Sequence, residues 1–451
     1  MKKLRLFDDR AFYAGLFAIA LPIMFQNFVN SLVNVADTVM IGRLGTVEIA
    51  GVGLGNQVFF FFNILLFGIV SGGGVFTAQY WGKRDLSGIR KTLGLCLSLS
   101  LGLALVFMAA CFFAPRFVIG FYSNDPAVVQ TGAEYLKTLS LSFVPFAISF
   151  AFTIMLRTVE KVRLAMTATI ISLSVNVILN WAFIFGLGPI PAMGVTGAAV
   201  ATLIARTIEA LIIVSVTYAK RYPPAASARE LFAFDAAFAK GFFAVAMPVM
   251  ANEFLWSFGI TLQNAIFART HTNAIAAFNI TNTVSSLAWV VFIGLGNGVA
   301  VMIGKKIGEG DHARAREYAA RITRFAPLLA AAVALVLVPV SRLLPVFFRV
   351  DAAVFATANV MFVILAFTYP FRAFNMSMVI GVCRAGGDTR FCAVYDVLFL
   401  WALALPLAAF ASFVLGAPAW VVYAAVVTEE PFKALLGWWR LRSGKWLHCV
   451  V

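Results

Sequence analysis

Long apolar runs, separated by short polar segments, fill the chain from one end to the other. A helix of about 20 apolar residues is long enough to cross a bilayer. Twelve runs reach this length, at residues 12–41, 47–80, 88–113, 127–156, 163–187, 194–219, 239–268, 273–304, 317–344, 353–383, 390–415 and 418–440. The first run is too long for the apolar core of a cleavable signal peptide. The pattern therefore predicts an all-α polytopic membrane protein with twelve transmembrane helices.

The composition excludes several classes of protein. Hydrophobic residues make up 62% of the 451 residues and charged residues only 12%, whereas soluble domains carry about 25% charged residues. The five cysteines have no CxxC or zinc spacing, and the three histidines lie at or beyond the ends of the runs. The sequence also lacks a GxxxxGK[ST] phosphate loop and the nucleophile–base pair of an enzyme. We therefore expect a protein that is not an enzyme, uses no metal or other cofactor and is not driven by ATP.

The net charge of +15 indicates membrane topology rather than nucleic-acid binding. With the N-terminus placed on one side, 26 of the 35 Lys and Arg residues fall on that side, five on the other and four within the runs. An excess of basic residues marks the cytoplasmic loops of membrane proteins. The asymmetry predicts a cell-membrane protein with an even number of spans and with both termini in the cytoplasm.

The two halves of the sequence are similar at a shift of 226 residues. Residues 22–85 align with 248–311 without a gap, and about 15 of the 64 positions are identical. Shared hydrophobicity alone does not explain the identical pairs Pro22/Pro248, Arg43/Arg269, Asn56/Asn282 and Asp85/Asp311. Because each repeat holds six spans, both copies have the same orientation, related by a pseudo-twofold axis along the membrane normal. We expect an N-lobe (1–219), a cytoplasmic linker (220–236) and a C-lobe (237–451) with a cleft between the lobes, as in a carrier that works by rocking.

Polar residues follow one face of the first span. Asn27, Asn30, Asn34 and Asp37 are three or four residues apart, which places them on one side of a helix. Polar groups in hydrocarbon must face protein or water, and a carboxylate there is costly. We interpret this stripe as the lining of a wet cavity, with a polar helix-packing seam as the alternative.

The fifth and sixth spans carry further oxygen ligands. Asn176 and Asn180 share a face of the fifth span, and Thr202 lies in a run of small residues in the sixth. Together with Asp37 they supply several oxygens and one negative charge. Such a set suits a proton or a monovalent cation better than a transition metal.

The second half is not a copy of this site. The position equivalent to Asp37 is Gln263, while Glu253 and Trp256 lie in the seventh span and Asp396 in the eleventh. These acids are candidates for coupling or substrate binding, and Trp256 could stack on a flat organic cation.

Three further charged groups lie within the runs. Arg206 and Glu209 are three residues apart and are expected to neutralise each other. Arg372 could pair with Asp396 or with the Glu429–Glu430 pair of the twelfth span; the sequence does not choose between them.

Several stretches resemble the signatures of the multidrug and toxic compound extrusion (MATE) family. They are Leu21–Pro22 with Val35–Gly45, Asn176–Asn180 with Phe183–Gly186, Gly194–Thr202, and Cys383–Thr389. The resemblance covers nearly the whole chain. It implies export of amphipathic, often cationic organic compounds by antiport against Na⁺ or H⁺. A lipid-linked precursor flippase of the wider superfamily is the alternative.

The resemblance also implies a cation-coupling site. Its members are Asp37, Asn176, Asn180, Ala198 and Thr202, with Asn180 at the position where the family has Asp. Since an acid is lost there, a Na⁺ site lacks one of its negative charges, and we favour H⁺ as the coupling ion. A lone carboxylate in a partly dry cavity can take and release a proton near neutral pH.

The predicted substrate cavity and partners follow from these residues. We expect its lining to include Asn27, Asn30, Asn34, Trp256 and Gln263. The expected partners are small amphipathic organic substrates and the lipid bilayer, with no nucleic acid, and the chain is expected to act as a monomer.

Overall fold

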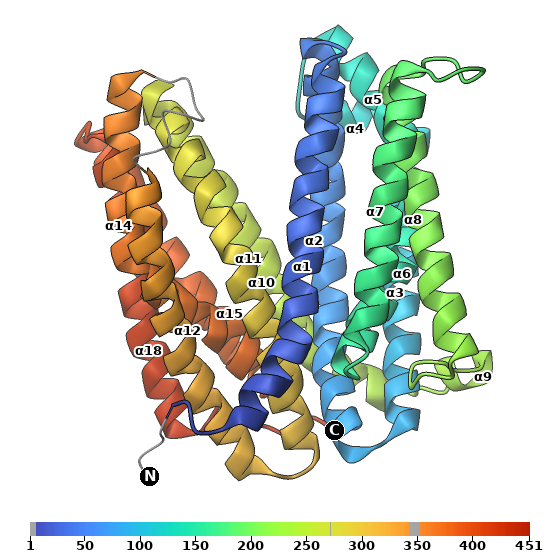
Figure 1. Cartoon of the computed structure of the whole chain (residues 1–451), viewed down its shortest axis with the longest axis vertical. Coiled ribbons are helices and arrows are strands. Elements are labelled where there is room, and N and C mark those ends of the chain that lie inside the picture. The colour runs from blue at the N-terminus through green and yellow to red at the C-terminus, as the bar shows by residue number, and fades with distance from the viewer. Residues whose placement is uncertain (1–5, 271, 342–350) are drawn as a thin grey trace. The chain divides into compact units, whose positions relative to one another are not determined.

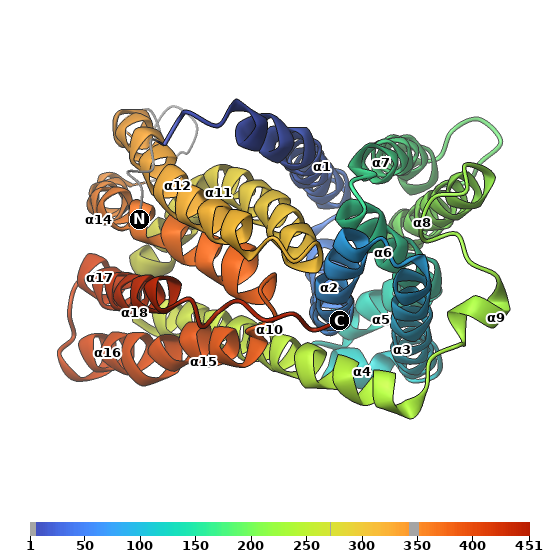
Figure 2. The ribbon, with the colours of Figure 1, turned by 90° about the horizontal axis from the view of Figure 1, so that it is seen from below.

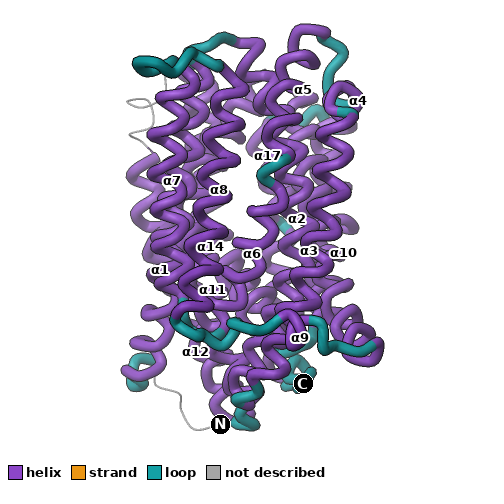
Figure 3. Tube along the Cα trace, turned by 90° about the vertical axis from the view of Figure 1, so that its right-hand side faces the viewer, coloured by secondary structure: helices purple, strands orange, loops and turns teal. Residues whose placement is uncertain are grey.

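The computed structural model describes residues 6–270, 272–341 and 351–451, which are almost entirely helical (Figure 1). Short loops join the helices at their ends (Figure 3). The charge count above includes Lys2, Lys3, Arg5, Arg342 and Arg349, and the histidine count includes His271; all six lie outside the described residues.

The long helices of the first half match the predicted runs. Their bounds are α1 (Arg10–Gly42), α2 (Thr46–Lys83), α3 (Leu86–Phe113), α7 (Val162–Phe185) and α8 (Gly194–Ala219). Shorter helices are α4 (Pro115–Gly120), α5 (Pro126–Ser140), α6 (Phe143–Thr158) and α9 (Ala228–Leu231).

In the second half, three long helices come first: α10 (Ala236–Thr270), α11 (Thr272–Gly308) and α12 (His312–Ser341). The rest is more broken: α14 (Ala352–Met376), η1 (Ser377–Arg384), α15 (Thr389–Phe399), η2 (Leu400–Ala404), α16 (Leu405–Ala409), η3 (Phe410–Val414), α17 (Ala419–Val427) and α18 (Glu429–Ser443). The η segments are π-helical turns within otherwise α-helical spans.

Within the described residues, ten helical segments are long and apolar enough to cross a membrane. The pair α5 and α6, bent by 52° at its junction, makes an eleventh if it counts as one span. The predicted run 418–440 forms the short helices α17 and α18, which meet at Thr428. An all-α membrane protein is therefore confirmed.

The helix bounds follow the sequence repeat. The first three long helices begin at Arg10, Thr46 and Leu86, and α10, α11 and α12 begin 226 residues later. The matched residues Asp85 and Asp311 have the same structural role in the two halves. Each carboxylate accepts a hydrogen bond of 3.0 Å from the backbone N–H of the residue three positions later. This satisfies a free N–H at the start of α3 and of α12.

The chain forms two compact units, residues 25–246 and residues 1–24 with 247–451. The boundaries lie in α1 and α10, close to Pro22 and Pro248 inside these helices. The first part of each helix therefore packs in the unit formed by the other repeat. The division into residues 1–219, 220–236 and 237–451 stays a prediction.

Matched small residues make this exchange possible. A Cβ at Gly72 of α2 would lie 2.6 Å from the Cβ of Ala246 in α10, and a Cβ at Gly298 of α11 would lie 3.2 Å from that of Ala20 in α1. Both pairs are related by the 226-residue shift. Each unit thus repeats one close helix crossing, which small residues allow.

Polar contacts fix the segments beside the first helix and after α8. Asp9 pairs with the buried Arg321 of α12. Burial raises the pKa of Asp9, but the backbone N–H of Phe12 and the Arg321 guanidinium outweigh it and hold this pKa below its ordinary value. In the other unit, α9 lies against α3 (Figure 2), where Glu230 pairs with Arg90 at 2.5 Å.

Candidate functional site

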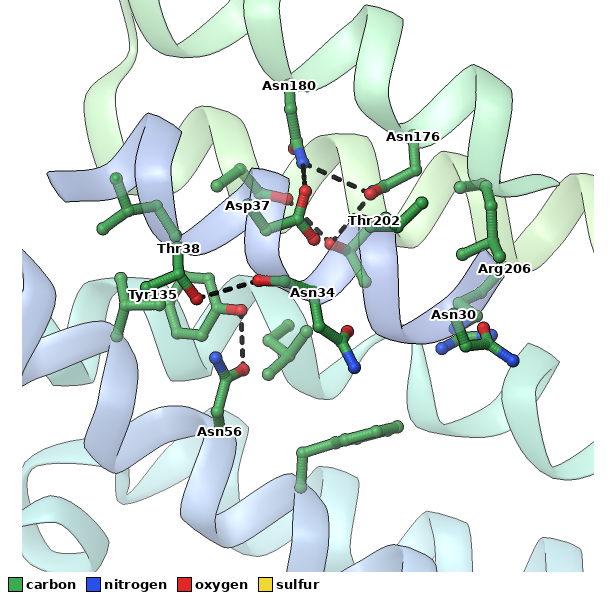
Figure 4. A pocket seen from close by; sticks show the side chains of 18 of the residues that line it. Asn30, Asn34, Asp37, Thr38, Asn56, Tyr135, Asn176, Asn180, Thr202 and Arg206 are labelled. Atoms are coloured by element: carbon green, nitrogen blue, oxygen red, sulfur yellow. Dashed lines mark hydrogen bonds between the residues drawn. The ribbon is translucent and has the colours of Figure 1, made fainter. Parts of the chain in front are cut away.

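Five helices of the 25–246 unit surround a cavity of about 470 Å³ (Figure 4). They are α1, α2, α5, α7 and α8, and the volume is that of a pocket for a drug-sized molecule. Aliphatic, aromatic and amide side chains share the wall. Among the described residues that line it, Asp37 is the only acid and Arg206 the only base.

Asp37 is held by a chain of polar groups from α7 and α8. Asn180 Nδ2 donates to Asp37 Oδ1 at 2.7 Å and lies 3.2 Å from Asn176 Oδ1. Asn176 Nδ2 in turn lies 3.4 Å from Thr202 Oγ1, and Thr202 donates to the Ala198 carbonyl at 3.0 Å. The five residues predicted as the cation-coupling set thus line one cavity, joined by hydrogen bonds.

Asn180 keeps one acceptor free. The residue is 2% exposed, and its buried Oδ1 has no hydrogen-bond partner among the described residues. Leaving such an acceptor unpaired costs about 1–3 kcal/mol. This oxygen is therefore available to accept a hydrogen bond or to ligate a cation close to the Asp37 carboxylate.

The α1 stripe reaches the cavity over part of its length. Asn30, Asn34 and Asp37 line it, and the Asn34 carbonyl accepts a hydrogen bond from Thr38. Asn27 is not among the described residues that line it. Spacing on one helix face predicts alignment along α1 but not where a cavity ends, which depends on the neighbouring helices.

Sequence reasoning missed other polar residues of the wall. Tyr135 of α5 donates to Asn56 Oδ1 at 3.0 Å, and Asn63 lies two turns further along α2. Asn63 Oδ1 is buried and has no hydrogen-bond partner in the part of the chain that the structure describes. The i, i+7 spacing of Asn56 and Asn63 was the available signal, whereas nothing in the sequence points to Tyr135.

The predicted pair of Arg206 and Glu209 is confirmed, with Arg206 Nη1 3.0 Å from Glu209 Oε2. Glu209 also accepts a hydrogen bond of 2.6 Å from Thr169, which accepts one of 2.8 Å from Gln26. The guanidinium lies 4.8 Å from the centre of the Phe146 ring. Its positive charge is thus balanced by Glu209, so Asp37 carries the unbalanced charge of the cavity.

The second-half candidates belong to the other unit. Glu253 Oε1 lies 2.6 Å from Arg384 Nη2, and Asp396 accepts from Asn252 and pairs with Lys433 at 3.2 Å. Each of these two acids therefore lies within ion-pair distance of a buried cation. Their role in coupling or substrate binding stays a prediction.

The remaining predicted residues of this unit differ in exposure. Gln263 of α10 is 5% exposed, whereas Trp256 is 39% exposed. The sequence left the partner of Arg372 open. In the structure its Nε lies 3.0 Å from Oε1 of Glu430, in the twelfth predicted run. No group of three or more His, Cys, Asp or Glu side chains able to hold a metal occurs within the described part of the chain.

The chain is similar to a protein family and to several known proteins along nearly its whole length. Residues 22–182 and 248–410 match the MatE family. The uncharacterized transporter YisQ of Bacillus subtilis (strain 168) is 24% identical over 441 residues, which cover 98% of this chain and 96% of that protein. The probable multidrug resistance protein NorM of Thermotoga maritima is 25% identical over 448 residues, which cover 96% and 92%.

A similar fold occurs among solved structures. A crystal structure of a MATE protein in complex with MaL6 matches with a TM-score of 0.87 and 20% identity, covering 99% of both chains. At this identity the likeness concerns the fold. It confirms the expected fold class, in which twelve helices form two six-helix lobes.

Proposed function

The chain belongs to the MatE family, whose members are membrane transporters and not enzymes, and we propose that it is a secondary antiporter that exports amphipathic organic cations. A cavity of about 470 Å³ lined by aromatic and amide side chains suits such a substrate. The relatives described as probable multidrug resistance proteins support export of several compounds. We also propose that both termini face the cytoplasm, as the basic loops indicate.

The coupling ion in this proposal is H⁺. One observation carries it: Asp37 is the only acid among the described residues of the cavity wall, and its partner Asn180 offers an amide and no second charge. A Na⁺ site must replace the hydration shell with several oxygens and gains strongly from each nearby negative charge. A single carboxylate can instead bind a proton when the cavity opens outward and release it to the cytoplasm.

Substrate and ion then compete for the same charge. When Asp37 is protonated the cavity loses its unbalanced negative charge, because Arg206 is already paired with Glu209. An organic cation is released in that state and bound once the proton has left. This exchange is the physical basis of antiport.

Transport by purified protein in lipid vesicles tests the proposal. When Na⁺ is absent, we expect an imposed proton gradient to drive ethidium, an amphipathic cation, in the direction opposite to the protons. At equal pH on both sides, a Na⁺ gradient should not drive its transport. Asp37→Asn, which keeps the size and removes the charge, should fold normally and abolish the proton-driven movement. Transport that needs Na⁺ and survives collapse of the proton gradient would show that H⁺ is not the coupling ion. Failure to move ethidium under either gradient would favour a flippase.

A further inference from the structure

A second group of charges, buried or partly buried, lies in the other unit, formed by residues 1–24 and 247–451. It joins α10, α14, η1, α15 and α18. Its acids are Glu253, Asp396, Glu429 and Glu430, and its bases are Arg372, Arg384 and Lys433. Among the residues that the structure describes, these four acids therefore face three bases, which leaves one negative charge of the group without a counter-ion when all are ionised.

Two of the acids have a base of their own. Glu253 pairs with Arg384 at 2.6 Å, and Glu430 pairs with Arg372 at 3.0 Å. Glu430 Oε2 also accepts a hydrogen bond of 2.7 Å from Asn375. Both carboxylates are thus stabilised in the ionised form.

The other two acids share one lysine. Lys433 Nζ lies 3.2 Å from Asp396 Oδ1 and 3.2 Å from Glu429 Oε2, and its side chain is only 5% exposed. Asp396 gains a further donor, because Asn252 Nδ2 lies 3.3 Å from its second oxygen. The lysine can balance one of these charges but not both.

Of these two carboxylates, Glu429 has fewer neighbouring groups that stabilise its negative charge. The residue is 8% exposed, and within the described part of the chain its Oε2 has the 3.2 Å ion pair with Lys433 but no further hydrogen-bond partner. Asn252 contacts Asp396, and its buried Oδ1 has no hydrogen-bond partner among the described residues. An uncompensated charge at this depth is costly, whereas a carboxyl that carries a proton is neutral.

We propose that Glu429 is a second proton-binding site, which takes up and releases a proton during transport. The proposal rests on the proposed antiport, and it means that two protons, one on Asp37 and one on Glu429, are exchanged for each substrate. The lysine makes release possible, because it stabilises the ionised form of whichever acid has given up the shared proton. A variant in which Glu429 is permanently neutral should then couple transport to one proton.

The number of protons can be read from the point at which net transport stops. Vesicles containing the protein are given a fixed pH difference of one unit, with the membrane potential held at zero by K⁺ and valinomycin, and with ethidium at different ratios across the membrane. One pH unit corresponds to a factor of about ten per exchanged proton. We expect the balance at an ethidium ratio of about 100 for the wild type and about 10 for Glu429→Gln.

The matched control is Glu429→Asp, which keeps the carboxyl and should hold the ratio near 100. Because the balance point does not depend on the rate, a variant that is merely slow gives the wild-type value. A wild-type ratio of about 10, or an unchanged ratio in Glu429→Gln, overturns the second proton site but leaves proton antiport intact. A wild-type ratio that ignores pH would instead overturn the proposed antiport itself.

Discussion

Replacement of Asn180 by Asp is the sharpest perturbation of the cavity. It keeps the size of the side chain and places a second carboxylate where an amide now donates to Asp37 at 2.7 Å. A unit charge about 4 Å from a bound ion is worth about 4 kcal/mol at an effective dielectric constant of about 20. This would raise the affinity for Na⁺ by up to about three orders of magnitude.

The observed gain will be smaller than this limit, because two carboxylates in contact also bind a shared proton more strongly. We therefore expect at least a tenfold gain, seen best at alkaline pH. The assay is ethidium transport in vesicles at equal pH on both sides with an imposed Na⁺ gradient. The wild type should not respond to Na⁺, and Asn180→Asp should.

The exchange variant Asp37→Asn with Asn180→Asp is the control. It restores one carboxylate, moved from α1 to α7, and should be driven by protons and insensitive to Na⁺. If Asn180→Asp gains no response to Na⁺, or if the wild type already responds, charge at this pair of residues does not decide the ion and the reasoning is refuted.

Two further predictions concern stability, measured as unfolding of the purified protein in detergent. A Cβ at Gly94 of α3 would lie 1.8 Å from the Leu231 carbonyl oxygen, so Gly94→Ala should destabilise by about 1–3 kcal/mol; Gly102→Ala in the same helix, where nothing lies within 4 Å, should stabilise slightly. Equal effects of the two changes would contradict the packing of α9 on α3. The pKa of Asp9 is lowered by folding, so its contribution with Arg321 is present above the ordinary pKa of about 3.9 and is lost as the pH falls through the folded value. Asp9→Asn should cost about 2 kcal/mol at neutral pH and flatten the loss of stability in acid; an unchanged acid profile would exclude this pair as its source.

Much of the fold could be predicted because its signals can be read directly from the order of residues in the chain. Apolar length gives the spans, and the matched residues at a shift of 226 give the repeat, whose aspartates cap α3 and α12. The exchange of the first parts of α1 and α10 between the units could not be predicted. It depends on which distant helix accepts Ala20 or Ala246, and apolar pattern carries no such partner information.

Part of the cavity lining could also be predicted from residue spacing along single helices. Helical spacing aligned Asp37 with Asn30 and Asn34, and Asn176 with Asn180, and the family resemblance joined the two groups. Tyr135 was missed because it reaches Asn56 from the bent pair of α5 and α6, and no pattern within α5 indicates that contact. The functional roles of these residues stay predictions.

The ion pairs of the unit formed by residues 1–24 and 247–451 could not be predicted from the sequence. Charges inside the apolar runs were visible, but their pairing depends on distances across several helices. Arg372 could have met Asp396 or either glutamate, and it meets Glu430. Lys433 lies between Asp396 and Glu429, and spacing within the two runs that carry these residues does not predict this contact.

Proton release on substrate binding tests most directly the claim that Asp37 exchanges a proton for substrate. Purified protein in weakly buffered detergent solution, at a pH where Asp37 is protonated, is mixed with saturating ethidium, and the change in pH is followed with an indicator dye. We expect the wild type to release protons and Asp37→Asn to release about one fewer proton per bound ethidium. Equal release by the two proteins, or none by the wild type, would contradict it.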